Sequence, residues 1–164
     1  MRLSLIITTY NWPESLELVL RSIECQTITP EEIIIADDGS TSETKAVMSK
    51  FQKKSELNFI YSWQADKGFR AAKSRNKAIV KSNTDYIILI DGDMILHPRF
   101  IEDHINNAQS GYFAQGFRVL LTQNKTKRIF DQQRISFSFF SSGLHNRKNA
   151  FLKAKISDKT KYSN

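Results

Sequence analysis

Two aspartates, Asp91 and Asp93, directly follow an apolar run, and their spacing could serve a metal ion. The run, residues 86–90, is typical of a buried strand in a mostly parallel sheet. Residues two apart on a continuing strand point the same way, and Gly92 between them permits a close approach. Carboxylate oxygens are hard ligands that suit Mg²⁺ or Mn²⁺ shared with a diphosphate. Taken alone, the same pattern fits a solvated turn equally well.

Polar residues also end the two earlier apolar runs of the chain. The first run ends in Thr8 and Tyr10, and the second ends in Asp37 and Asp38. Because the carboxyl ends of parallel strands meet at one rim, these side chains are expected to lie together. A carboxylate there can accept the imide N–H of uracil, and a tyrosine ring can stack on a base. Such residues also simply begin helices, but three polar strand ends in succession favour a ligand rim.

Basic side chains precede the strand that carries Asp91. Arg70, Lys73 and Arg75 follow a short loop around Gly68. Guanidinium and ammonium groups there could contact phosphate or ribose oxygens.

Strand and helix patterns alternate along the chain and would position these groups. The expected strands are residues 1–10, 33–36, 58–63, 86–90 and 112–121. The expected helices are residues 13–25, the segment after residue 40, residues 70–81 and a segment beginning at Pro98. This alternation predicts an α/β domain with a doubly wound, mostly parallel sheet, right-handed crossovers and flanking helices.

The first two helices have starts that resemble capping boxes. Asn11 is followed three residues later by Glu14, and Ser40 is followed three residues later by Glu43. In such a box the first side chain accepts from the backbone of the new helix. We therefore expect Asn11 and Ser40 to cap these helices.

Composition places the chain among ordinary globular domains. It has 164 residues, 40% hydrophobic and 25% charged, which suffices for one domain with a sizeable core. No segment has the apolar length of a membrane span, and we expect no signal peptide. The single cysteine excludes an internal disulfide and fits a reducing compartment. We expect a cytoplasmic protein.

Positive charge concentrates in the last part of the chain. Residues 125–164 hold ten basic and two acidic residues, a balance of +8. Such a segment could meet anionic lipid at the inner face of a membrane, a phosphorylated acceptor or nucleic acid, or be a solvated tail. We expect no nucleic-acid partner. Phe137, Phe139 and Phe140 suggest one more strand or a buried loop, and poor order is expected beyond residue 151.

Four segments together resemble the family-2 glycosyltransferases. They are residues 6–11, 34–40, 67–76 and 90–94, and their order and spacing match that family over roughly residues 1–98. They look most like bacterial members related to chondroitin polymerases and to galactosyltransferase-type domains. The resemblance implies the GT-A fold and a nucleotide-diphosphate sugar donor. It divides the chain into a nucleotide-sugar-binding domain, residues 1–121, and an acceptor-side region with a basic tail, residues 122–164.

The resemblance implies roles for the first two strand ends at the nucleotide. Thr8 and Tyr10 would border it. Asp38 would read uracil, which makes UDP the expected nucleotide, and Asp37 would lie beside it.

The same resemblance implies how the diphosphate is held. Arg75 and Asn76 match the family's Arg-Asn pair, where nucleotide and diphosphate bind. Asp91 would lie near the ribose and the metal, and Asp93 would be the direct ligand of Mn²⁺ or Mg²⁺. The reaction implied is an inverting transfer to a saccharide or lipid-linked acceptor.

The chain departs from the family pattern on the acceptor side. Members place an acidic catalytic base well downstream, but after Asp103 only Asp131 and Asp158 are acidic. We expect the donor half of a truncated enzyme and leave the base unassigned. The alternative is an inactive fragment that binds a nucleotide sugar without transferring it. The glycine-rich loops of sugar nucleotidyltransferases and of dinucleotide dehydrogenases are absent.

Overall fold

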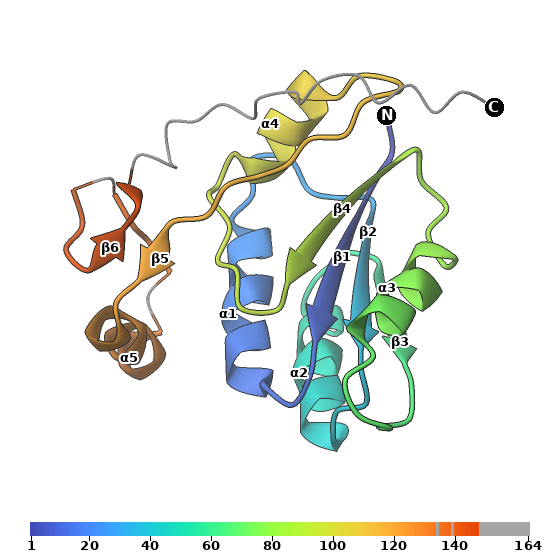
Figure 1. Ribbon diagram of the computed structural model, residues 1–164, viewed down its shortest axis with the longest axis horizontal. Coiled ribbons are helices and arrows are strands. Elements are labelled where there is room, and N and C mark those ends of the chain that lie inside the picture. The colour runs from blue at the N-terminus through green and yellow to red at the C-terminus, as the bar shows by residue number, and fades with distance from the viewer. Residues whose placement is uncertain (134, 139, 148–164) are drawn as a thin grey trace. The chain divides into compact units, whose positions relative to one another are not determined.

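A computed structural model describes residues 1–133, 135–138 and 140–147 of the chain (Figure 1). The chain divides into two compact units, Met1–Glu102 and Asp103–Asn164. All residues predicted to form the site belong to the first unit. The predicted division between residues 121 and 122 stays a prediction.

The first unit is built on a parallel four-stranded sheet (Figure 1). Its strands are β1 (Leu3–Thr9), β2 (Glu32–Asp37), β3 (Phe59–Trp63) and β4 (Tyr86–Asp91), in the order β3-β2-β1-β4. The predicted α/β class with a parallel sheet flanked by helices is confirmed.

The position of β4 differs from the expectation of a buried strand. Among the described residues β4 pairs only with β1, so it forms an edge, and Leu89 is 48% exposed. The prediction was wrong because an apolar run reveals strand propensity but not how many neighbours the strand has.

Helices cover both faces of the sheet. The helices α1 (Pro13–Glu24) and α2 (Ser42–Gln52) contact each other, and α3 (Ala71–Ile79) packs on β1, β2 and β3. Right-handed crossovers from β1 to β2 to β3 put α1 and α2 on one face. The chain then turns back to β4, which puts α3 on the other. The reversal lies between β1 and β4, where open α/β sheets bind ligands.

Apolar side chains of the helices pack against the sheet. The predicted stripe of α1 is confirmed, since Leu16, Val19, Leu20 and Ile23 are at most 1% exposed. On the other face, a cluster joins Ala78 of α3 to side chains of β1 and β2. A small residue there lets the helix lie close to the strands.

Only part of the apolar face predicted for α3 points inward. Ala71 and Ala78 are buried, whereas Ala72 is exposed and Ile79 is 36% exposed. The expectation of an inward face of four residues was therefore half right, because the buried face of this short helix is narrow.

The expected capping boxes do not form. The residues before α1 and α2 are Trp12 and Thr41, and neither side chain caps its helix. Asn11 Oδ1 instead accepts from the Thr41 backbone N–H at 3.0 Å, and the Asn11 backbone N–H donates to Ser40 Oγ at 2.9 Å. Adjacent strands bring these two loops together, so the polar side chains join the loops.

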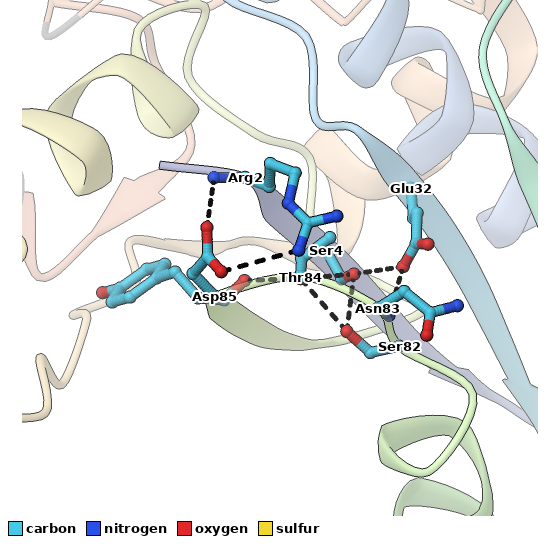
Figure 2. A network of polar contacts seen from close by, with 8 residues as sticks. Arg2, Ser4, Glu32, Ser82, Asn83, Thr84 and Asp85 are labelled. Atoms are coloured by element: carbon cyan, nitrogen blue, oxygen red, sulfur yellow. Dashed lines mark hydrogen bonds and ion pairs between the residues drawn. The ribbon is translucent and has the colours of Figure 1, made fainter.

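A polar cluster ties the strands together at the amino-end side of the sheet (Figure 2). Glu32 is 7% exposed, and its Oε2 accepts from Ser4 Oγ at 2.6 Å and from the Asn83 backbone N–H at 3.2 Å. Ser4 Oγ also lies 2.8 Å from the hydroxyl oxygens of Ser82 and Thr84. A buried carboxylate requires such partners. The cluster fixes β1 against β2 and against the loop that enters β4.

The described part of the second unit contains little regular structure. Its elements are α4 (Phe100–Asn107), whose first three residues belong to the first unit, β5 (Leu120–Leu121), α5 (Gln123–Gln132) and β6 (Leu144–His145). β5 and β6 pair antiparallel, and Thr122 Oγ1 caps α5 by accepting from the Lys125 backbone N–H at 3.3 Å. The sequence signals after residue 122 were too weak to predict α5.

The long strand predicted over residues 112–121 does not form. Only Leu120–Leu121 is a strand, and Phe113 and Phe117 are 60% and 52% exposed. An apolar run becomes a strand only where another strand satisfies its backbone groups. Phe140 is 85% exposed in a turn, and Phe139 lies outside the described residues.

Two other expectations concern membranes and the tail. Within the described residues, none of the helices is long and apolar enough to cross a membrane. The basic tail beyond residue 147 and its predicted poor order lie outside the described residues.

Candidate functional site

The carboxyl ends of β1, β2 and β4 form one rim, as the sequence predicts. Thr8 of β1 stands opposite Asp91 of β4, and Thr9 stands opposite Asp37 of β2. The rim includes the point where the strand order reverses.

Arg75 joins two strands at this reversal. It projects from α3, and its Nε donates to Thr8 Oγ1 at 2.9 Å while its Nη2 donates to Asp91 Oδ1 at 2.7 Å. The Arg75 and Asp91 side chains are 39% and 49% exposed, so water reaches the ion pair. The guanidinium keeps further N–H donors for an anionic ligand.

Gly92 allows β4 to end close against β1. Its backbone N–H donates to Thr8 O at 2.8 Å, and a Cβ built on Gly92 would lie 2.9 Å from that oxygen and 3.2 Å from Thr9 Cβ. The strand ends at Asp91 and a turn follows, so Asp93 does not lie on a continuing strand as assumed. Asp93 is exposed on this turn.

Asp37 is buried beneath the rim. It is 0% exposed, and its Oδ1 accepts from the backbone N–H groups of Gly39 and Ser40 at 3.0 and 2.7 Å. Its Oδ2 accepts from the Tyr61 hydroxyl at 2.6 Å. Burial, with a smaller effect of the Asp37 carboxylate, raises the pKa of Tyr61. Asp37 thus holds the turn that follows β2.

Asp38 connects that turn to the loop after β3. It is 3% exposed, with Oδ1 accepting from Gln64 Nε2 at 2.6 Å and Oδ2 accepting from the Arg70 backbone N–H at 2.7 Å. Each carboxylate oxygen has lone pairs for a further bond. Asp38 can therefore anchor the loop and still accept one N–H from a ligand.

Tyr10 contacts a residue that the sequence analysis missed. The Tyr10 hydroxyl donates to Asp66 Oδ2 at 2.9 Å, and Asp66 Oδ1 accepts from the Gly68 backbone N–H at 3.0 Å. The hydrogen bond from the Gly68 N–H, followed by the one from the Tyr10 hydroxyl, lowers the pKa of Asp66 below its usual value. The Asp66 carboxylate in turn raises the pKa of Tyr10. Half of Tyr10 is exposed. The signal for Asp66 was its position two residues before a loop glycine, which is typical of an aspartate that stabilises a turn.

The structure thus separates the predicted residues into three groups. Thr8, Arg75 and Asp91 are in direct contact. Tyr10 and Asp38 lie on loops beside them, and Asp37 lies underneath. The exposed Asn76 and Asp93 make no side-chain hydrogen bond to another described residue.

The carboxylates fit a metal ion held together with a ligand. No group of three or more His, Cys, Asp or Glu residues that could hold a metal occurs in the described parts of the chain. Mg²⁺ and Mn²⁺ bound with nucleotides commonly take one or two carboxylates from the protein and the rest of their ligands from phosphate and water. Asp91 and Asp93, on two sides of Gly92, are suited to that arrangement.

The chain belongs to the family described as glycosyl transferase family 2, whose model matches residues 4–162. Hyaluronan synthase of Pasteurella multocida is 32% identical over 104 residues, 63% of this chain and 10% of the synthase. Chondroitin synthase of Escherichia coli is 32% identical over 104 residues, 63% of this chain and 15% of that synthase. Cholesterol galactosyltransferase of Borreliella burgdorferi is 30% identical over 109 residues, 66% of this chain and 30% of that enzyme. The chain therefore spans a third or less of each of these relatives.

Solved structures confirm the predicted GT-A fold. TarS of S. aureus, solved in complex with UDP, has a TM-score of 0.56 and 25% identity over 65% of this chain and 31% of its own. The mannosyltransferase PcManGT of Pyrobaculum calidifontis, solved with GDP-Man and Mn²⁺, has a TM-score of 0.60 and 21% identity over 71% of this chain and 35% of its own.

Proposed function

We propose that this chain carries the donor site of a metal-dependent, inverting glycosyltransferase that uses a UDP-sugar. The observation that carries the proposal is Arg75, which bridges Thr8 and Asp91 where the strand order reverses. A cation beside a carboxylate at this rim suits a ligand with phosphate and hydroxyl groups. The UDP bound to TarS and the Mn²⁺ bound to PcManGT support the same assignment. The acceptor in this proposal is a saccharide or a lipid-linked molecule.

The nucleoside is held by the ends of β1 and β2. The Asp38 carboxylate accepts the imide N–H of uracil, and its bonds to Gln64 and Arg70 fix its orientation. The half-exposed ring of Tyr10 stacks on the base, and Asp66 fixes the ring through the hydroxyl. Asp37 does not contact the nucleoside but positions Asp38, because it holds the backbone turn that carries Asp38.

The diphosphate and the metal are held on the other side of the rim. Arg75 and Asn76 of α3 donate to phosphate or ribose oxygens, and Asp93 and Asp91 provide the carboxylates for Mn²⁺ or Mg²⁺. When bound, such an ion neutralises the charge of the departing diphosphate. Arg75 orients the leaving group by charge-assisted hydrogen bonds. We assign no base to the acceptor hydroxyl.

Calorimetry with UDP tests the donor site. We expect UDP to bind in the presence of Mn²⁺ and to bind at least tenfold more weakly with EDTA or after Asp93→Asn. The matched control, Asp131→Asn, removes an exposed carboxylate of α5 and should leave the affinity within twofold. If the folded wild-type protein does not bind UDP under either condition, the proposed site is wrong.

A transfer assay then distinguishes an active enzyme from a fragment that only binds a nucleotide sugar. Release of UDP from a UDP-sugar in the presence of saccharide acceptors, lost in Asp93→Asn, supports an active enzyme. UDP binding with no release from any donor supports the alternative, a fragment that binds nucleotide sugar and does no chemistry.

A further inference from the structure

A basic pocket lies beside the rim, between α3 and the loop after β3. Its volume is about 320 Å³. Its lining includes the four cations Lys67, Arg70, Lys73 and Lys77, together with Trp63 and Gln64. Thr8, Tyr10, Asp91 and Asp93, which we assign to the donor, do not line it. The pocket therefore lies apart from the residues proposed to hold the diphosphate and the metal, although two of its residues, Gln64 and Arg70, bond to Asp38 of the proposed uracil contact.

The residues that line this pocket carry an excess of positive charge. Among the described residues no Asp or Glu lines it, and the ammonium groups of Lys67 and Lys73 form no ion pair. Lys77 Nζ donates one hydrogen bond to Trp63 O at 3.0 Å and keeps its other donors. Asp66, which precedes Lys67, stays ionised while it accepts from the Tyr10 hydroxyl, and the charge of Arg70 contributes to the lowered pKa of Asp66, so one of the four positive charges is partly balanced. Four cations around one concavity attract a multiply charged anion.

Two side chains of the pocket carry hydrogen-bonding atoms that lack partners. Gln64 is 6% exposed, and its Oε1 has no hydrogen-bond partner among the residues that the structure describes, although its Nε2 binds Asp38. The Nε of Arg70 is likewise buried and unpaired. Such atoms are rare in folded proteins, because a buried polar group without a hydrogen bond destabilises the folded state. Because both atoms are buried, a phosphate group in the pocket reaches them only after the Gln64 and Arg70 side chains rotate toward it.

We propose that this pocket binds a diphosphate group, independently of the leaving group at the rim. A diphosphate has the several negative charges that four cations require, whereas a single carboxylate would leave most of them unneutralised. The half-exposed Trp63 offers an aromatic surface to whatever the diphosphate is attached to. The diphosphate comes either from a soluble compound or from a lipid-linked one, and both present the same chemistry to the pocket.

Binding of inorganic pyrophosphate, with EDTA present to keep metal out of the rim, tests this proposal. Trp63 and Trp12 are the two tryptophans of the chain, and only Trp63 lines the pocket. We expect pyrophosphate to shift the indole N–H resonance of Trp63 in ¹H–¹⁵N spectra and to leave that of Trp12 in place. Absence of a shift at Trp63 at millimolar pyrophosphate would overturn the proposal.

Paired lysine substitutions separate the pocket from general charge effects. Lys67→Gln with Lys73→Gln should weaken pyrophosphate binding at least tenfold, because two charge-assisted contacts are lost. Lys53→Gln with Lys54→Gln removes the same charge from exposed positions at the end of α2 and should change the affinity less than twofold. Equal losses in both double variants would show nonspecific attraction and overturn the proposal.

Two further experiments distinguish the pocket from the donor rim and identify the source of the diphosphate. Asp93→Asn should leave pyrophosphate binding unchanged, and a loss as large as that in the pocket variant would place the anion at the rim and refute a separate site. Cosedimentation with phosphatidylcholine vesicles containing a polyprenyl diphosphate, reversed by pyrophosphate, assigns a lipid-linked ligand. Binding of soluble pyrophosphate without cosedimentation assigns a soluble one.

Discussion

Substitution of Asp37 distinguishes a residue that holds the backbone from one that binds the ligand. Its carboxylate is 0% exposed and accepts three hydrogen bonds, from the backbone N–H groups of Gly39 and Ser40 and from the Tyr61 hydroxyl. Asp37→Ala leaves these donors without their acceptor. Each buried unsatisfied donor costs about 1–3 kcal/mol.

The expected effect on stability is large. The two backbone donors together predict that Asp37→Ala lowers the free energy of unfolding by roughly 2–6 kcal/mol, a large part of the ~5–15 kcal/mol typical of a domain. Asp37→Asn keeps one acceptor oxygen and should cost about 1–2 kcal/mol. Because one kcal/mol shifts the melting temperature of a chain of this size by about 2–4 °C, Asp37→Ala should melt roughly 10 °C lower.

Urea unfolding followed by circular dichroism measures these differences, with Asp131→Asn as the control. That exposed substitution should stay within about 0.5 kcal/mol of the wild type. UDP binding of folded Asp37→Asn should remain within a few-fold of the wild type, because the carboxylate has no exposed surface. Unchanged stability of Asp37→Asn together with abolished UDP binding would refute the reasoning and make Asp37 a ligand-binding residue.

Two further predictions concern the end of β4 and alkaline pH. Gly92→Ala should lower the free energy of unfolding by about 1–3 kcal/mol and weaken UDP binding, because its Cβ would lie 2.9 Å from Thr8 O. Gly116→Ala, whose Cβ meets nothing within 4 Å, should do neither, and equal urea midpoints for the two variants would contradict the steric argument. The raised pKa of Tyr61 means that above pH 10.0 the unfolded state loses a proton that the folded state keeps, so stability should fall as the pH rises from there. Tyr61→Phe should reduce this fall in urea titrations at pH 9 and 11, and an identical pH dependence in both proteins would exclude Tyr61 as its source.

Local pattern was sufficient for β1, β2 and α1. Residues 3–7, apart from Ser4, and residues 33–36 are apolar over a strand's length, and the stripe of α1 repeats at helical spacing, so burial could be inferred from neighbours in sequence. The order of strands and helices then placed Thr8, Asp37 and Asp91 at the same end of the sheet.

Expectations failed where the outcome depended on distant partners. Asn11 and Ser40 have the spacing of cap residues, but each bonds across to the other's loop. Residues 112–121 have strand composition, yet only the last two form a strand. A hydrogen bond to a neighbouring turn or strand is decided by which segments meet, and spacing along the chain does not encode that.

The sequence by itself determined the parallel α/β fold, the family and the set of polar residues at the strand ends, because periodicity and motif spacing are local properties of the chain. Only the tertiary structure decided which of those residues are buried, which are exposed and which contact one another. It buried Asp37 beneath the rim, left Asp93 exposed, and brought Arg75 of α3 between Thr8 and Asp91. Burial and contact between strands depend on packing in three dimensions, and for that reason two adjacent aspartates, Asp37 and Asp38, with the same chemistry have different surroundings.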